Sequence, residues 1–148
     1  VGEMLFGQYE HSFDDKGRLV IPSKMKEELI YAQPLYVMQG FDGCLSVYTK
    51  ANFDAYVAEL NKFSMFNSDA RNVLRLSLSS VVELNIDKAN RIQISNVVLS
   101  KYKIGKEVMI VGVNDHFEIW DKKAFLDYES NNKDQLEVLA DKLAKQNG

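Results

Sequence analysis

Residues 10–21 read EHSFDDKGRLVI, and residues 83–94 read ELNIDKANRIQI. Aligned without a gap, the two stretches are identical at Glu10/Glu83, Asp14/Asp87, Arg18/Arg91 and Ile21/Ile94. Apolar residues also coincide, because Phe13 aligns with Ile86 and Leu19 with Ile92. Self-similarity of this kind is the signature of an internal repeat. We therefore predict that the chain contains one structural unit twice.

The similarity continues downstream in the same order. The segment LYVM at 35–38 parallels VMIV at 108–111, and LSVY at 45–48 parallels FEIW at 117–120. Several matches in one order favour duplication over chance. We predict a first repeat at 4–62, a helical connector at 63–80, a second repeat at 81–130 and a helical tail at 131–148.

Each copy is predicted to run strand, tight turn, strand, short helix, strand, turn, strand, helix. Gly17 and Asn90 occupy the same turn position, and both residue types tolerate a left-handed backbone. Thr49 and Asp121 stand at matching positions as helix N-caps, and Ser95 is expected to cap the short helix of the second copy.

A sheet unit of this size cannot bury enough apolar surface alone. Two interlocked copies would share one core and cover each other's edges. We therefore expect an α+β, mainly β fold, a pseudo-two-fold barrel of two hairpin units with flanking helices.

Apolar residues at helical spacing predict helices outside the sheet units. One is expected at 50–62, another at 67–80, and a third in the tail from Asn132. The tail helix would place Leu136, Leu139, Ala140 and Leu143 on one face. That face needs a partner surface, either in this chain or in a neighbouring subunit.

Composition restricts the function without assigning it. A net charge of −3 and a pI near 5.4 argue against a strongly basic nucleic-acid coat. DNA contact depends on where cations are displayed, however, and acidic helices could face away from a duplex. The single cysteine, Cys44, suits a reducing compartment, the opening residues show no export leader, and the longest apolar runs are too short to cross a bilayer. We expect a cytoplasmic protein with no membrane partner.

The opening stretch MLFGQYEHSFDDKGRLVIPSK, residues 4–24, resembles the start of the MraZ family of bacterial transcriptional regulators. The resemblance extends from Met4 to about Tyr128. It implies a double swapped-hairpin barrel of the SpoVT-AbrB type, assembled into a ring of identical subunits. It also implies a nucleoid-associated regulator that binds repeated promoter sites in double-stranded DNA, upstream of the division and cell-wall gene cluster.

The family motif Asp-x-x-x-Arg corresponds to Asp14 with Arg18 and to Asp87 with Arg91. Because Asn90 replaces the usual glycine in the second copy, we give the first copy more weight. An arginine held on a rigid hairpin can make two hydrogen bonds to a phosphate or to the O6/N7 edge of guanine. The alternative is an ion pair between each arginine and its own aspartate, and the two roles can coexist.

The other candidate residues have simpler interpretations than DNA contact or catalysis. Asp14 and Asp87 begin tight turns, where aspartate caps backbone N–H groups, so we prefer a structural role to a catalytic one. Most surface lysines are simply solvated, and the candidate phosphate contacts are Lys16, Lys24 and Lys88. Arg71 and Arg75 could form a second basic face, but a solvated helix surface explains them as well.

No sequence motif suggests that this protein is an enzyme. His11 and His116 have no metal-ligand spacing around them, and Cys44 has no histidine close in sequence. We expect no catalytic residues, no cofactor and no metal site. The alternative to DNA binding is an oligomeric protein-interaction module, antitoxin-like or a scaffold, which the acidic pI and the apolar tail face would suit.

Overall fold

The computed structural model describes residues 4–147, and the two halves of the chain repeat the same order of elements. The first half contains β1 (Leu5–Ser12), β2 (Arg18–Val20), α1 (Ser23–Ile30), β3 (Leu35–Gln39), β4 (Leu45–Thr49) and α2 (Lys50–Leu60). The second half contains β5 (Val82–Leu84), β6 (Arg91–Gln93), α4 (Asn96–Lys101), β7 (Glu107–Asn114), β8 (Phe117–Asp121) and α5 (Lys122–Asn132). Helix α3 (Ser68–Leu78) joins the halves, and α6 (Leu136–Asn147) follows the second. The α+β class and the repeated order of elements are confirmed.

The strands form a six-stranded antiparallel sheet in the order β1-β7-β8-β4-β3-β5 and a separate two-stranded ribbon of β2 and β6. Exchanging each strand for its counterpart in the other half reverses the sheet order and leaves it otherwise unchanged. The topology is therefore pseudo-two-fold. The first strand of each half pairs with the other half, since β1 lies on β7 and β5 lies on β3.

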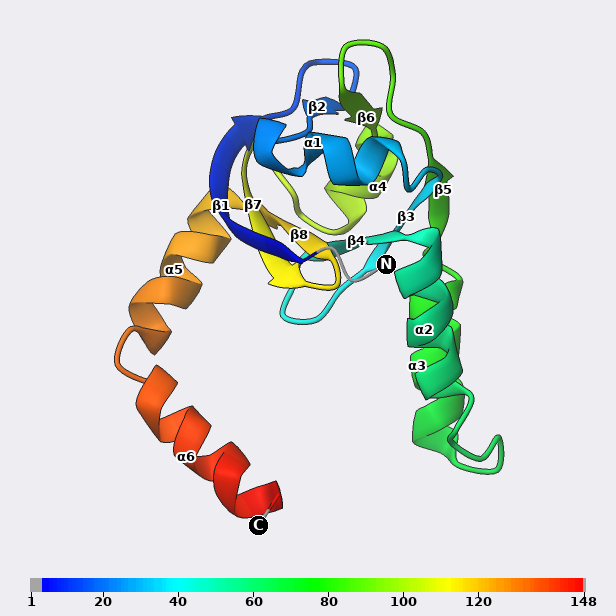
Figure 1. Cartoon of the computed structure of the whole chain (residues 1–148), viewed down its shortest axis with the longest axis vertical. Helices are drawn as coiled ribbons and strands as arrows, with labels where there is room; N and C mark the ends of the chain where they lie inside the picture. The colour runs from blue at the N-terminus through cyan, green and yellow to red at the C-terminus, as the bar shows by residue number, and fades with distance from the viewer. Residues whose placement is uncertain (1–3, 148) are drawn as a thin grey trace.

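The expected closed barrel is wrong in one respect, because the sheet is open. Strands β1 and β5 are its two edges and do not pair with each other among the described residues. The chain leaves each edge at the turns that begin with Asp14 and Asp87, and the next strands pair with each other as the ribbon (Figure 1). Helices α1 and α4 lie between the ribbon and the sheet, so helix packing replaces the strand contacts that would close a barrel.

The main core fills the space that these elements enclose. Leu19 and Ile92, at the centres of the ribbon strands, are 0% exposed and belong to the same cluster as Phe117 of β8. Met25 and Leu29, one helical turn apart on α1, point into it as well. The ribbon is thus anchored in the hydrophobic core.

The predicted turns and caps are confirmed. Gly17 has φ of 75° and Asn90 has φ of 61°, so both turns use the left-handed region. The side chains of Thr49, Ser95 and Asp121 accept hydrogen bonds from backbone N–H groups at the starts of α2, α4 and α5. These local features follow from residue type at each position.

The remaining helices form two projections on the side opposite the ribbon (Figure 1). The tail differs from the prediction, because α5 continues through Asn132 and a separate helix, α6, begins at Leu136. Every described residue from Lys133 to the end of α6 is exposed. The apolar face of α6 therefore has no cover within the described part of its own chain.

Candidate nucleic-acid interface

The ribbon of β2 and β6 brings the two copies of the Asp-x-x-x-Arg motif to one end of the molecule. Arg18 lies opposite Gln93, and Arg91 lies opposite Val20. Because side chains alternate across a strand, these four share the outer face, and the buried pair Leu19 and Ile92 forms the inner face. Diagonal neighbours on an antiparallel pair are about 7–8 Å apart, so the two arginines stand side by side.

In the first copy, Asp14 holds both the turn and the arginine. Its Oδ1 accepts hydrogen bonds from the backbone N–H groups of Lys16 and Arg18, at 2.9 Å each. Its Oδ2 accepts from Nε of Arg18 at 2.6 Å. The ion pair suggested by the four-residue spacing is therefore present, and the structural role preferred for Asp14 is visible in its hydrogen bonds.

The second copy repeats this arrangement. Oδ1 of Asp87 accepts from the backbone N–H groups of Ala89 and Arg91 at 2.8 and 2.9 Å, and Oδ2 accepts from Nε of Arg91 at 2.9 Å. The backbone N–H of each arginine, together with its side chain, lowers the pKa of the aspartate despite some desolvation. Both carboxylates are thus ionised at neutral pH and hold the guanidinium groups in one orientation.

The terminal amino groups of each guanidinium are available to bind a ligand. Each arginine uses Nε for its aspartate, and its terminal amino groups make no hydrogen bond within the described residues. Each arginine side chain is 31% exposed. Two oriented, partly exposed guanidinium groups can each donate a pair of hydrogen bonds to a planar acceptor or an anion.

The two turns also hold each other. Ile94 N donates to Gly17 O at 2.8 Å, and symmetrically Ile21 N donates to Asn90 O at 2.8 Å. Side chains of the second copy add to this, because Gln93 Nε2 donates to Lys16 O at 2.9 Å and Asn96 Nδ2 donates to Asp15 O at 3.2 Å. The two turns and the ribbon, residues 14–20 and 87–93, which we call the tip, are therefore held together as one unit.

Gln93 and Asn96 were not predicted to belong to this site. The alternation of polar and apolar residues in RIQI at 91–94 is typical of a strand with one buried face, but the contact across the repeats was not visible in the sequence.

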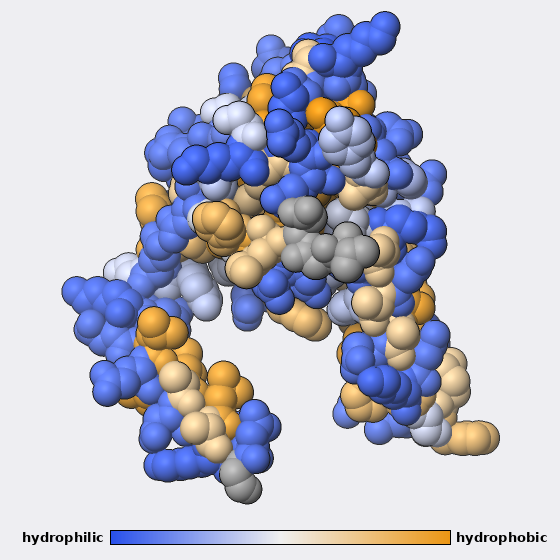
Figure 2. Space-filling view, viewed as in Figure 1, coloured by the Kyte–Doolittle hydropathy of each residue, from blue (hydrophilic) through white to orange (hydrophobic). Residues whose placement is uncertain are grey.

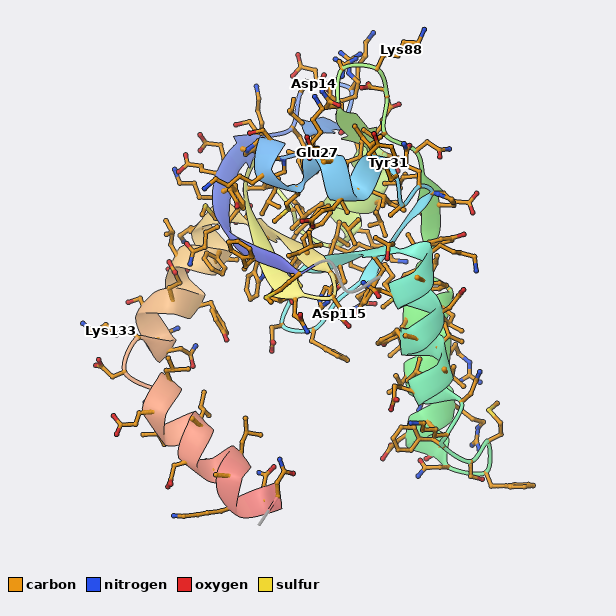
Figure 3. All side chains as sticks on the ribbon, viewed as in Figure 1. Asp14, Glu27, Tyr31, Lys88, Asp115 and Lys133 are labelled. Carbon is orange, nitrogen blue, oxygen red and sulfur yellow. The ribbon has the colours of Figure 1, made fainter. Side chains whose placement is uncertain are left out.

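The lysine candidates are distributed unevenly. Lys16 and Lys88 lie exposed in the two turns, and Figure 3 shows Asp14 and Lys88 at the same end of the molecule. Lys24 is exposed on α1, outside the two turns. Arg71 and Arg75 lie on α3, within the projections on the opposite side, where they donate to Met65 O and Asn72 Oδ1. The structure therefore gathers four of the cations at the tip and keeps the α3 pair away from it.

A family model described as "MraZ protein, putative antitoxin-like" matches residues 4–76 and again residues 78–147. The chain belongs to the MraZ family. The resemblance stated from the opening stretch is confirmed.

Relatives within the MraZ family align over almost the whole chain. A protein of Mesoplasma florum is 38% identical over 93% of this chain and 94% of its own length. One of Ureaplasma parvum serovar 3 is 39% identical over 95% and 97%, and one of Thermoanaerobacter sp. (strain X514) is 38% identical over 95% and 96%. Each of these three carries the name "Transcriptional regulator MraZ".

The negative charge of this MraZ family member is not concentrated in its helices. Acidic helices do not explain the net charge, because α1 to α6 together contain ten basic and nine acidic residues. The turn and ribbon segments 14–20 and 87–93 are locally basic. Their cations are Lys16, Arg18, Lys88 and Arg91, and their anions are Asp14, Asp15 and Asp87. The excess of positive charge is small, so a single tip attracts an anionic ligand only weakly.

The described part of this MraZ family chain offers little support for a metal site, a cysteine nucleophile or a membrane-spanning helix. Residues 4–147 contain no group of three histidine, cysteine or acidic side chains that could hold a metal ion. Cys44 is buried, and burial raises the pKa of its thiol far above the usual range, which disfavours a nucleophilic thiolate. No helix among these residues has both the length and the apolar character needed to span a membrane.

Proposed function

We propose that this chain is a transcriptional regulator that binds double-stranded DNA through the β2–β6 ribbon. One observation carries the proposal: two identical aspartate–arginine arrangements present two guanidinium groups on one exposed face. The names of the relatives support a role in transcription. In this proposal Arg18 and Arg91 contact DNA, Asp14 and Asp87 orient them, and Lys16, Lys24 and Lys88 approach phosphates.

The finer parts of the proposal follow the family resemblance. The fold is of the SpoVT-AbrB type, with repeats at 4–62 and 81–130, the connector at 63–80 and the tail at 131–148. The protein acts in the cytoplasm, at the nucleoid, on repeated promoter sites of the division and cell-wall gene cluster. It binds them as a ring of subunits, so that several weak tips act together through effective concentration.

Arg18→Ala should weaken binding to a DNA duplex that the parent protein binds specifically by at least about tenfold, because a bidentate base or phosphate contact is lost. Arg18→Lys should recover only part of the loss, since lysine keeps the charge without the planar fork. The measurement is a fluorescence-anisotropy titration with duplex DNA at several salt concentrations. Loss of a phosphate contact should also make the salt dependence shallower by about one counterion.

Arg71→Ala is the matched control, because it removes an arginine from the far side of the molecule. It should leave affinity within about twofold of the parent. Equal affinities for the parent protein and Arg18→Ala would contradict the proposed interface.

Two features support assembly with a second copy of the chain. The first is the uncovered apolar stripe of α6, where Leu136, Leu139 and Leu143 are 81%, 47% and 58% exposed. Figure 2 shows hydrophobic side chains gathered along this helix. Burying such side chains contributes about 1.5–3 kcal/mol each, which offsets the entropy lost when two copies associate, so the stripe favours a partner surface.

The second feature is a pair of grooves at corresponding places in the two halves. The groove beside the start of α2 is lined by Glu27, Glu28 and Asp54, and Lys50 is the one cation among the described lining residues. The groove beside the start of α5 is lined by Lys106, Lys122 and Lys123 with Glu107 and Asp121. Because Glu10 pairs with Lys122, the second groove carries little net charge, whereas the first groove is acidic. This difference in charge suits a head-to-tail contact between copies, and such contacts form rings when the rotation between copies closes.

Replacing Leu139 and Leu143 together by aspartate should reduce the particle mass, because charges would enter the proposed contact. Both residues are exposed in the single chain, so the near-ultraviolet circular dichroism of the core should not change, whereas the far-ultraviolet helix signal of α6 should fall because the helix loses its cover. Multi-angle light scattering measures the mass. Lys145→Glu, on the polar side of the same helix, is the control and should leave the mass unchanged. An unaltered mass in the double variant would exclude α6 from the contact.

The antitoxin-like wording of the family description and the apolar α6 face favour one alternative, a protein-interaction module without direct DNA binding. Tight capture of a protein partner, together with failure to bind any upstream duplex, would support that function.

A further inference from the structure

The outer face of the β2–β6 ribbon is symmetric at one pair of positions and asymmetric at the other. Arg18 and Arg91 correspond between the repeats and are identical, whereas Val20 corresponds to Gln93. We propose that Val20 and Gln93 determine sequence specificity by reading different base pairs, so that one subunit recognises a non-palindromic site. This inference rests on the proposed DNA-binding function and goes beyond it.

The ribbon has suitable dimensions for base reading. A two-stranded antiparallel ribbon fits the major groove, which is about 12 Å wide. Residues two apart on a strand are separated by about 7 Å, close to two base-pair steps of 3.4 Å. Arg18 and Val20 on one strand, with Gln93 and Arg91 opposite them, therefore face a short run of neighbouring base pairs.

Gln93 is already oriented in the free protein. One hydrogen of its Nε2 is donated to Lys16 O at 2.9 Å, which fixes the plane of the amide. Its Oε1 and the other N–H make no hydrogen bond within the described residues. An amide with one free acceptor and one free donor matches the N6 donor and N7 acceptor of adenine.

Val20 offers the opposite chemistry. It is 46% exposed on the outer face, although its neighbour Leu19 is fully buried on the inner face. A branched apolar side chain among cations cannot bind a phosphate, but it can pack against the methyl group of thymine. The two corresponding positions therefore differ in the base edge that each can recognise.

The difference between Val20 and Gln93 affects the symmetry of the DNA site that one subunit can recognise. A ribbon with the same two residues on both strands would read a sequence and its inverted copy equally well. One apolar and one amide side chain remove that equivalence, while the two arginines keep a similar grip on both halves. A single subunit should therefore prefer one orientation on its site.

Two variants test this by making the outer face the same on both strands. Gln93→Val gives valine at both positions, and Val20→Gln gives glutamine at both. The site preferred by the parent protein is first selected from a pool of randomised duplexes. Affinities of the parent and both variants are then measured on that duplex, on every single base-pair substitution of it, and on an unrelated duplex.

The parent protein should discriminate by about tenfold or more at the base pair read by Gln93. Gln93→Val should exchange the adenine preference at that base pair for a thymine preference, while its affinity for the unrelated duplex stays the same. Val20→Gln should exchange a thymine preference for an adenine preference in the other half of the site. Val20→Gln leaves the hydrogen bond between Gln93 and Lys16 in place. If Gln93→Val fails to fold, the base preference of Val20→Gln still tests the inference.

Identical substitution profiles for the parent and both variants would overturn the inference. A uniform loss of affinity on all duplexes would overturn it too, because that indicates a structural role. Arg18→Ala separates this inference from the proposed function. If the parent protein prefers no duplex and Arg18→Ala does not change its affinity, the proposed function fails. If binding to the selected site depends on Arg18 but not on Val20 or Gln93, the proposed function stands and only this inference fails.

Discussion

Gly17→Ala lowers the free energy of unfolding by at least about 3 kcal/mol in our expectation, and it disrupts the ribbon tip. Gly17 has φ of 75°, where any residue with a side chain is strained by about 1–2 kcal/mol. A Cβ would in addition clash with the carbonyl oxygen of Ile94. That oxygen cannot move away easily, because Ile94 N donates to Gly17 O at 2.8 Å in the same turn pair.

Gly43→Ala separates the two causes. Gly43 has φ of 90°, but a Cβ there meets no atom within 4 Å. It should therefore cost only the backbone strain, about 1–2 kcal/mol. Urea denaturation followed by circular dichroism measures both variants. Equal losses for Gly17→Ala and Gly43→Ala would show that the predicted clash between the turns does not occur.

Leu19→Ala is expected to cost about 2–5 kcal/mol, whereas Val20→Ala should cost less than about 0.5 kcal/mol. The residues are neighbours on β2, but Leu19 is 0% exposed and packs in the main core, and Val20 faces outward. A cavity beneath the ribbon would also loosen its partner strand, since Leu19 lies opposite Ile92. The contrast tests which face of the ribbon belongs to the core.

Denaturant unfolding again gives the stability, and amide hydrogen exchange of residues 91–93 reports whether β6 loosens. Leu19→Ala should raise exchange there, while Val20→Ala should leave it unchanged. Similar stabilities for the two variants would mean that the ribbon does not lie with its leucine face on the core.

The sequence predicts part of the candidate site well. The repeated Asp-x-x-x-Arg spacing indicated both the turn and the ion pair, which the structure shows at 2.6 and 2.9 Å. It did not predict that Gln93 bonds to Lys16 of the other repeat, because residues 77 positions apart meet only after the strands pair. The composition did not show where the negative charge lies, since it gives the sum of the charges and not their distribution.

The sequence by itself determined the duplication, the left-handed turns at Gly17 and Asn90, and the caps at Thr49, Ser95 and Asp121. These features are local, because each depends on backbone dihedral angles and hydrogen bonds within a few residues. Tertiary structure alone decided that β1 pairs with β7, that the sheet stays open and that the two arginines share one face. Pairing between distant strands depends on which arrangement buries the most apolar surface, and no short stretch of the chain contains that information.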